Sequence, residues 1–110
     1  MERGDIVMVC LDPTVGAEIN KTRPCVVVSP DEMNGILRTV SVVPVTSRFR
    51  PLPTRKEIAA SSQSGLSVES YAALDQIKTI DKERVIRNIG RVSESEMSGI
   101  CDTLCEMFSF

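Results

Sequence analysis

The sequence predicts a mainly β fold of the α+β class, a small twisted β-barrel with one helix packed on it at the C-terminus. Three observations predict it. Short runs rich in valine and isoleucine alternate with stretches that contain proline, glycine or aspartate. Only the stretch from residue 93 onward places apolar side chains at helical spacing. The chain has 110 residues, of which 42% are apolar, and this suits one domain spanning residues 1–110.

The first two strands are expected in the N-terminal quarter of the chain. Residues 5–11 are densely apolar and end at Asp12 and Pro13, which predicts a buried strand. Residues 12–22 are mostly polar and form a long connecting loop. Residues 25–29 contain three successive valines and form a second strand that Pro30 stops.

The next stretch predicts a turn, a third strand and a basic loop. Residues 31–35 form the turn, and Asn34-Gly35 within it favours positive φ. Residues 37–46 are rich in valine and threonine and form the strand. Pro44 lacks an N–H, so this strand lies at an edge or is bulged near its end. Residues 47–57 follow as a loop that carries basic and proline residues.

The C-terminal half predicts more strands and then the helix. Residues 58–65 are small and polar, as in a turn, and residues 66–80 hold one or two strands. A short helix capped by Asp81 and a last strand at 86–92 follow. Ser93 and Glu96 have the spacing of a capping box, which predicts the start of the final helix. Its apolar face would consist of Met97, Ile100, Cys101, Leu104 and Phe108.

The composition excludes several classes of function. The formal charge is −2, so bulk charge does not favour non-specific coating of nucleic acid. The chain has no histidine and therefore lacks the commonest proton carrier near neutral pH. Neither a signal peptide nor a membrane span of about 20 apolar residues is recognisable. We therefore expect a cytoplasmic protein with reduced thiols, which act as small buried apolar groups: Cys10, Cys25, Cys101 and Cys105.

No nucleotide-binding glycine loop, zinc-protease motif or serine-hydrolase motif is present. The remaining candidates are polar residues scattered along the chain, with one aromatic residue in the basic loop. They are Glu18, Lys21, Thr22, Arg23, Thr46, Ser47, Arg48, Phe49, Arg50, Arg55, Lys56, Asp75 and Gln76.

Two interpretations of these residues are open. In the structural one, Arg23 forms a salt bridge to Glu18 or Asp75, and residues 48–56 are a solvated loop. In the functional one, Arg23 holds a phosphate through two parallel hydrogen bonds, because a guanidinium stays protonated and cannot act as a base. Thr46 and its neighbour Ser47 would hold another phosphate oxygen. A base of single-stranded RNA could then stack on the loop phenylalanine while the arginines follow the backbone.

Four segments resemble the MazF/PemK toxin family, in the order that the family shows. They are "RGDIVMVCLDPTVGAEINKTRPCVVVSP", "VVPVTS", "LPTRKEI" and "LDQIKTIDKERV", and together they run nearly end to end. The last two look most like the Bacillus-type branch. The resemblance implies an SH3-like barrel, a homodimer and a cytoplasmic toxin of a toxin–antitoxin pair. It also implies cleavage of single-stranded RNA at short motifs without a metal or cofactor, and neutralisation by an acidic antitoxin segment.

The resemblance assigns roles by position. Arg23 and Thr46 match the family's central catalytic pair, Glu18 matches its loop glutamate, and Asp75 matches its acidic position. Ser47 and Gln76 match RNA-contacting positions. Ala17 and Ala73 depart from the Kid-type members, which carry a histidine and a second arginine at these places.

Two other functions remain open on the sequence. A toxin of the CcdB type has the same architecture but poisons DNA gyrase through its C-terminal residues, here "MFSF". A degenerate homologue would only bind RNA or a protein partner, and the two alanines are the support for it. The first predicts that activity depends on the tail, and the second predicts RNA binding without cleavage.

Overall fold

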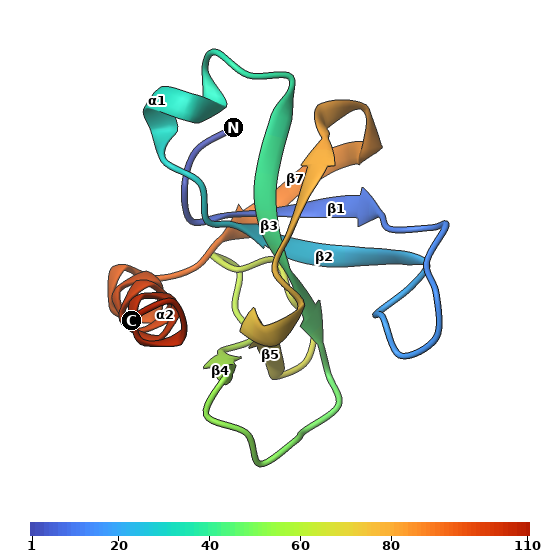
Figure 1. The fold of residues 1–110 in the computed structure, drawn as a ribbon. Helices are drawn as coiled ribbons and strands as arrows, with labels where there is room; N and C mark the ends of the chain where they lie inside the picture. The colour runs from blue at the N-terminus through green and yellow to red at the C-terminus, as the bar shows by residue number, and fades with distance from the viewer.

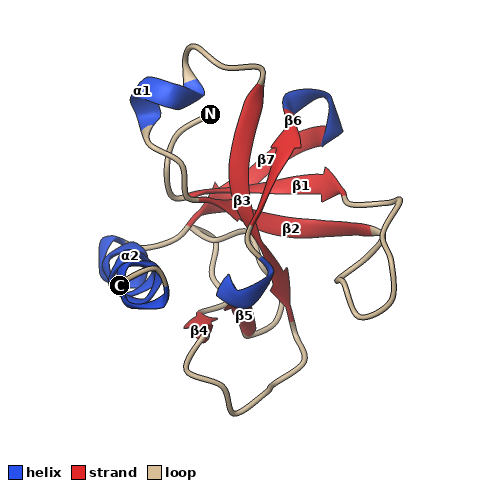
Figure 2. Ribbon diagram, viewed as in Figure 1, coloured by secondary structure: helices blue, strands red, loops and turns tan.

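The computed structural model describes all 110 residues as a strongly twisted antiparallel sheet with a long helix at its side (Figure 1). Figure 2 shows that strands dominate and that the longest helix is the last one. The elements, in chain order, are β1 (Asp5–Cys10), β2 (Thr22–Val27), α1 (Asp31–Asn34), β3 (Thr39–Thr46), β4 (Arg55–Ile58), β5 (Ser70–Ala73), η1 (Leu74–Gln76), β6 (Lys78–Asp81), η2 (Lys82–Arg84), β7 (Val85–Arg91) and α2 (Glu94–Met107).

The strands pair in the order β4-β5-β3-β2-β1-β7, and β6 also pairs with β3. Every pairing is antiparallel. β4 and β7 lie at the two ends of this order, so the sheet twists strongly without closing on itself. The predicted fold class, a mainly β twisted sheet with a C-terminal helix, is therefore confirmed.

Pro44 predicted either an edge strand or a bulge near the end of the strand. The edge is wrong, because β3 has partners on both sides, and the pairing with β2 across Pro44 shows no register shift. One side of β3 pairs with β2, where Cys25 lies opposite Pro44. The other side pairs first with β6, through residues 39–42, and then with β5, through residues 45 and 46. Pro44 lies in the gap between these two partners, where the ladder is interrupted and a missing N–H is tolerated.

The turn predicted at 31–35 is instead the short helix α1. Gly35 has a φ of −80°, so the expected positive φ at Asn34-Gly35 is also wrong. The reason is that Asn34 is buried and bonds to Ser29: its side-chain amide donates to the Ser29 carbonyl at 3.0 Å, and the Ser29 hydroxyl donates to the Asn34 Oδ1 at 2.6 Å. These contacts hold the segment in a helical turn.

The C-terminal half contains one strand that the sequence did not predict, β4, which takes its residues from the expected loop 47–57 and the expected turn 58–65. Arg55 and Lys56 lie in β4 and not in the loop before it, so that loop ends at residue 54. Residues 66–80 contain two strands, β5 and β6, separated by the single turn η1. The predicted cap at Asp81 is confirmed, because its side chain accepts a hydrogen bond from the Glu83 N–H at the start of η2.

The predicted capping box at the start of α2 is confirmed. The Ser93 hydroxyl accepts from the Glu96 N–H at 3.1 Å, and the Glu96 Oε1 accepts from the Ser93 N–H at 2.8 Å. The Glu96 Oε2 also accepts from the N–H of Ala59, just after β4, at 2.9 Å. The predicted apolar face is correct at Ile100, which is buried, but wrong at Phe108, which follows the last helical turn and is exposed.

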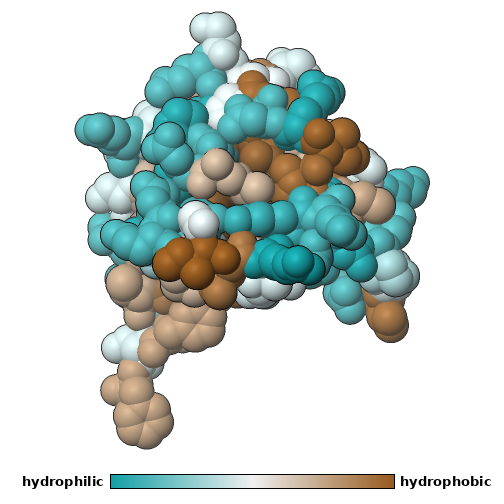
Figure 3. All heavy atoms as spheres, turned by 90° about the horizontal axis from the view of Figure 1, so that it is seen from above, coloured by the Kyte–Doolittle hydropathy of each residue, from teal (hydrophilic) through white to brown (hydrophobic).

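Two groups of buried side chains fill the interior. The larger group lies beneath α2, where Ile100 packs with strand residues such as Ile6 and Ile58. The smaller group includes Val9 and Val42 and lies between β1, β2, β3 and β6. Figure 3 shows one largely hydrophilic face with apolar atoms in separate patches. Together the two groups hold the strands in place, so that the loops at their ends can form a site.

Candidate active site

A cavity of about 610 Å³ opens where the β1–β2 loop, the end of β3, the β3–β4 loop, the start of β4 and η1 meet. We call it the Arg23 cavity. All four candidate catalytic residues line it: Glu18, Arg23, Thr46 and Asp75. Five of the candidate binding residues line it as well: Ser47, Arg48, Arg50, Arg55 and Gln76. The structure therefore brings together segments that are up to 58 positions apart in the chain, from residue 18 to residue 76.

Arg23 and Thr46 both face this cavity from neighbouring strands, β2 and β3. The Arg23 Nε donates to the Asn20 carbonyl at 3.0 Å, which fixes the guanidinium, and its terminal nitrogens have no protein partner. The Thr46 Oγ1 accepts from the Arg48 N–H at 3.1 Å, so its own hydrogen is free to donate. No acidic side chain lies within salt-bridge distance of Arg23, which removes the structural interpretation of this arginine.

Asp75 is held by Thr54, the last residue of the β3–β4 loop, and by Arg55, the first residue of β4. The Arg55 Nε and Nη2 donate to its two oxygens at 2.8 and 3.0 Å, and the Thr54 hydroxyl donates at 3.0 Å. The hydrogen bond from Arg55 lowers the pKa of Asp75, and the same bond raises the pKa of Arg55. Asp75 is therefore a poorer proton acceptor than a free carboxylate.

Glu18 and Gln76 occupy the opposite wall, formed by the β1–β2 loop and η1. The Glu18 carboxylate is exposed, and its only charged neighbour is Lys78, whose Nζ lies 3.8 Å away. The Gln76 Oε1 accepts from the Ile19 N–H at 2.7 Å, and its Nε2 donates to the Ala17 carbonyl at 3.4 Å. Gln76 thus fixes the backbone on both sides of Glu18, and this role was not predicted.

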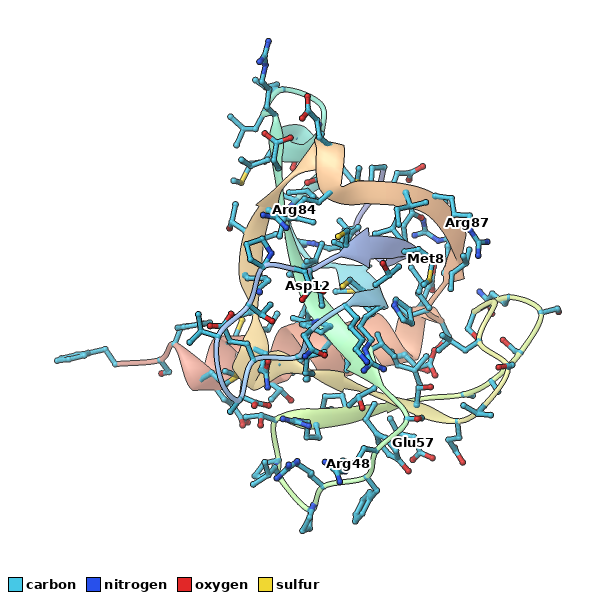
Figure 4. All side chains as sticks on the ribbon, turned by 90° about the vertical axis from the view of Figure 1, so that its right-hand side faces the viewer. Met8, Asp12, Arg48, Glu57, Arg84 and Arg87 are labelled. Atoms are coloured by element: carbon cyan, nitrogen blue, oxygen red, sulfur yellow. The ribbon has the colours of Figure 1, made fainter.

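The cavity carries more positive than negative charge that is unpaired. Arg55 is neutralised by Asp75, but Arg23, Arg48 and Arg50 have no acidic partner. Figure 4 shows Arg48 on the loop that follows β3. A hollow with several unpaired guanidinium groups attracts a polyanion and can hold phosphate oxygens through paired hydrogen bonds.

Four of the candidate binding residues lie outside the cavity. Lys21 directly precedes β2, and Thr22 is the first residue of that strand. Lys21 has a positive φ of 66°, and its N–H donates to the Asp12 side chain. Lys56 follows Arg55 on β4 and lies against Gly99 of α2, since adjacent strand residues point to opposite faces. The contribution of these residues to binding stays a prediction.

Phe49 is the fourth residue outside the cavity, and it packs against Tyr71 in an edge-to-face arrangement. The ring centroids are 5.5 Å apart, and 65% of Phe49 is exposed. Tyr71 was not predicted as a site residue. The one sequence signal for it was that it is the only tyrosine in the chain. Together the two rings offer an aromatic surface beside the cavity on which an unpaired base can stack.

The two departures from the Kid-type pattern lie in and beside the cavity. Ala17 lines it and contributes its carbonyl to Gln76. Ala73 lies in β5 directly opposite Arg55 of β4. Because cross-strand partners point to the same face, the Arg55 side chain lies next to the position where Kid-type members carry their second arginine. Arg55 is bound to Asp75, so it is not equivalent to a free guanidinium.

The four thiols are free and differ in their burial. Burial raises the pKa of the Cys25 thiol to about 12, so Cys25 stays protonated as predicted for a buried apolar group. Cys105 is exposed, and its prediction as a buried group is wrong. No three histidine, cysteine or acidic side chains cluster closely enough to hold a metal ion. None of the helices has the length and apolar character to span a bilayer.

Comparison with known proteins gives the class to which this fold and cavity belong. Residues 2–108 match the family described as PemK-like, MazF-like toxin of type II toxin-antitoxin system. The chain belongs to this family. It is 38% identical to endoribonuclease MazF9 of Mycobacterium tuberculosis, covering 94% of this chain and 92% of the relative. It is 37% identical to endoribonuclease PemK of Escherichia coli and 33% identical to endoribonuclease EndoA of Bacillus subtilis, covering 79% and 90% of them and 94% of this chain.

Solved structures agree on the fold. MazF from Deinococcus radiodurans superposes with a TM-score of 0.87 over the whole chain and 97% of that structure, at 22% identity. An endoribonuclease from a mycobacterial species, solved in complex with its cognate antitoxin, superposes with a TM-score of 0.79 at 24% identity, over 96% of this chain and 92% of that structure. The finer placement in the Bacillus-type branch stays a prediction.

Proposed function

We propose that this chain is the toxin of a type II toxin–antitoxin pair and that it cleaves single-stranded RNA at short sequence motifs without a metal ion. The single observation that carries the proposal is the shared cavity in which Arg23 and Thr46 face the same space beside further unpaired arginines. The endoribonuclease relatives support RNA as the substrate and favour cleavage over gyrase poisoning.

The proposed reaction is an attack of the ribose 2′-oxygen on the adjacent phosphorus. A new P–O bond forms, the P–O bond to the 5′-oxygen breaks, and the products end in a 2′,3′-cyclic phosphate and a 5′-hydroxyl. The 2′-OH proton goes to a base, and the departing 5′-oxygen takes up a proton. Positioning and stabilisation of the extra negative charge contribute most to the rate of such a reaction.

The residues of the Arg23 cavity divide these tasks. Arg23 stabilises the negative charge through its free terminal nitrogens and assists proton delivery to the departing oxygen. Thr46 donates its hydroxyl to a non-bridging phosphate oxygen. Glu18 accepts the 2′-OH proton, because its only ionic contact is with the Lys78 Nζ at 3.8 Å. Asp75 is less suited, since its oxygens already accept from Arg55 and Thr54.

The same charges define the proposed partner. An acidic antitoxin segment would occupy the cavity in place of RNA, with its carboxylates on Arg48 and Arg50. The mycobacterial endoribonuclease that was solved with its cognate antitoxin supports a partner of this kind. We further propose that residues 1–110 act as one unit, as a homodimer in the cytoplasm.

The test is incubation of the purified protein with a long RNA that contains paired and unpaired regions, with and without excess EDTA. We expect cleavage in unpaired regions at unchanged rate in EDTA, with cyclic phosphate ends on the products. Strict dependence on an added metal would refute the proposed chemistry. RNA binding without any cleavage would indicate a degenerate homologue, and growth arrest that depends on the last four residues would indicate a gyrase poison.

A further inference from the structure

A second hollow adjoins the Arg23 cavity and shares Arg23 and Ser47 with it. Its volume is about 190 Å³, and its outer wall is the segment Leu66, Ser67 and Val68 that precedes β5. Arg23 therefore lies between two hollows, with the arginine-rich cavity on one side and this smaller one on the other. A nucleotide next to a phosphate held at Arg23 is therefore within reach of this second hollow.

The chemistry of the two hollows differs. The Arg23 cavity contains four arginines, whereas the second hollow contains no charged group other than Arg23 itself. Its other polar groups are the hydroxyls of Ser47, Ser67 and Ser70, and aliphatic side chains such as Val68 complete it. A phosphate bound there would contact only one cationic side chain, that of Arg23. A flat, neutral group with apolar faces and hydrogen-bonding edges fits better, and a nucleobase is such a group.

The wall of the second hollow is held in place before any ligand arrives. The Ser64 side chain is buried, donates to the Ala59 carbonyl at 2.9 Å and accepts from the N–H groups of Ser61 and Leu66. Gly65 has a φ of 72°, and a Cβ at this position would lie 2.0 Å from the Ile89 carbonyl oxygen. Residues 59–68 therefore form an uncharged loop pressed onto β7, with little freedom to lose on binding.

The hydroxyls at the rim are not all used within the protein. Ser70 is buried and donates to the Val68 carbonyl at 2.9 Å, which fixes the position of Val68. Ser67 and Ser47 are exposed and form no side-chain hydrogen bond. Val68 is 54% exposed although it is aliphatic. Two free hydroxyls and one exposed aliphatic group thus face a preformed hollow next to the proposed catalytic arginine.

We infer that this hollow binds the base of the nucleotide next to the scissile phosphate, and that residues 66–68 contribute to the choice of cleavage site. The inference rests on the proposed function. Val68 packs on a face of the base, while Ser67 and Ser47 bond to its edge. The loop is thereby a specificity element in addition to the two loops that form the Arg23 cavity.

The experiment combines protein variants with RNA that lacks single bases. A cleavage site is first mapped with the wild-type protein, and RNAs are then made with an abasic ribonucleotide at each position around it. kcat/KM is measured for the wild type, Val68→Trp and Ser67→Ala. We expect Val68→Trp to lower kcat/KM on the intact RNA by about tenfold, the loss that one displaced base would cause. On the RNA that is abasic at one position next to the cut, the variant and the wild type should be equal.

Matched controls separate this effect from misfolding. Ile36→Trp introduces the same side chain at a position that is 83% exposed and lies outside the hollow. Ser62→Ala removes a hydroxyl from the same loop outside the hollow. Both controls should match the wild type, and circular dichroism should give equal melting temperatures for all variants.

Two results overturn the inference while the proposed function stands. One is a kcat/KM equal to that of the wild type for Val68→Trp and Ser67→Ala on every RNA, which would show that the hollow binds no base and would favour a protein partner there. The other is an equal loss at all abasic positions, which would show a general disturbance and no base-specific contact. If the wild type cuts no RNA under any condition, the proposed function falls and this subsite falls with it.

Discussion

Two cavities of similar size lie in different parts of this protein, and their arginines are used in different ways. The Arg23 cavity has a volume of about 610 Å³. The other, which we call the Arg91 cavity, lies at the start of α2, has a volume of about 510 Å³ and contains Arg3 and Arg91. The Arg91 Nη1 bonds to the Asp5 carboxylate at 2.6 Å, and its Nη2 donates to the Arg3 carbonyl at 3.0 Å. The Arg3 Nε donates to the Val28 carbonyl at 2.9 Å.

The difference shows that neither volume nor the presence of arginine marks the site. Arg91 holds the N-terminal segment against β7, so its hydrogen bonds are used for the fold. Arg23 and Arg3 are each anchored through Nε alone, but only Arg23 shares its cavity with other arginines that have no acidic partner, Arg48 and Arg50. A guanidinium held in place but incompletely satisfied is available for a ligand. This contrast predicts which substitutions will damage activity and which will damage stability.

The largest expected effect is loss of cleavage in Arg23→Ala. Removal of one stabilising donor from an active site typically lowers the rate by about 10²–10³. We expect at least this loss in kcat/KM on RNA with an unchanged melting temperature, because Arg23 forms no salt bridge. Arg87→Ala, which removes an exposed arginine from β7, serves as the control. Near-normal cleavage by Arg23→Ala would remove the distinction between the two cavities.

The next effect is loss of stability in Arg91→Ala. The substitution leaves the mostly buried Asp5 carboxylate without its charged partner, and an unsatisfied buried group costs about 1–3 kcal/mol. We expect a lower denaturant midpoint for unfolding and full cleavage activity of the folded protein. Arg87→Ala is again the matched control on the same strand. Activity that falls while the denaturant midpoint stays constant would mean that the Arg91 cavity also contributes to function.

The smallest expected effect concerns the ion pair inside the Arg23 cavity. Because the pKa of Asp75 is lowered in the folded state, the pair adds stability above the unfolded pKa of about 3.9, and this stability is lost as the pH falls through the folded pKa. The pair is partly exposed, so its contribution is under about 1 kcal/mol. Asp75→Asn should therefore lose less stability than the wild type between pH 5 and pH 3, measured by denaturant unfolding. An identical loss in both would show that the pair contributes nothing.

Much of the fold could be predicted because its signals are local. The valine runs, the capping box at Ser93 and the cap at Asp81 depend only on neighbouring residues, and each formed the predicted element, although β2 begins at Thr22 and not at Cys25. Pro44 misled because its tolerance depends on which strands lie beside β3, and the sequence does not contain that information. Asn34-Gly35 misled because the bonds between Asn34 and Ser29 outweigh the turn preference of the dipeptide.

The site was predictable as a set of residues but not as a set of contacts. The resemblance placed Arg23, Thr46 and Glu18 in one group, and the cavity contains all three. No sequence pattern indicated that Arg55 would bind Asp75, or that Gln76 would fix the β1–β2 loop. These contacts depend on the distance between segments that the twist of the sheet brings together.

The Glu96 side chain has a further consequence for the molecule. One oxygen closes the first turn of α2, and the other holds the backbone where the uncharged loop begins at Ala59. A single carboxylate therefore joins the helix to the loop whose far end forms the rim beside Arg23. The start of the loop is therefore fixed relative to the first turn of α2 by this one side chain, although Ala59 and Glu96 are 37 positions apart in the chain.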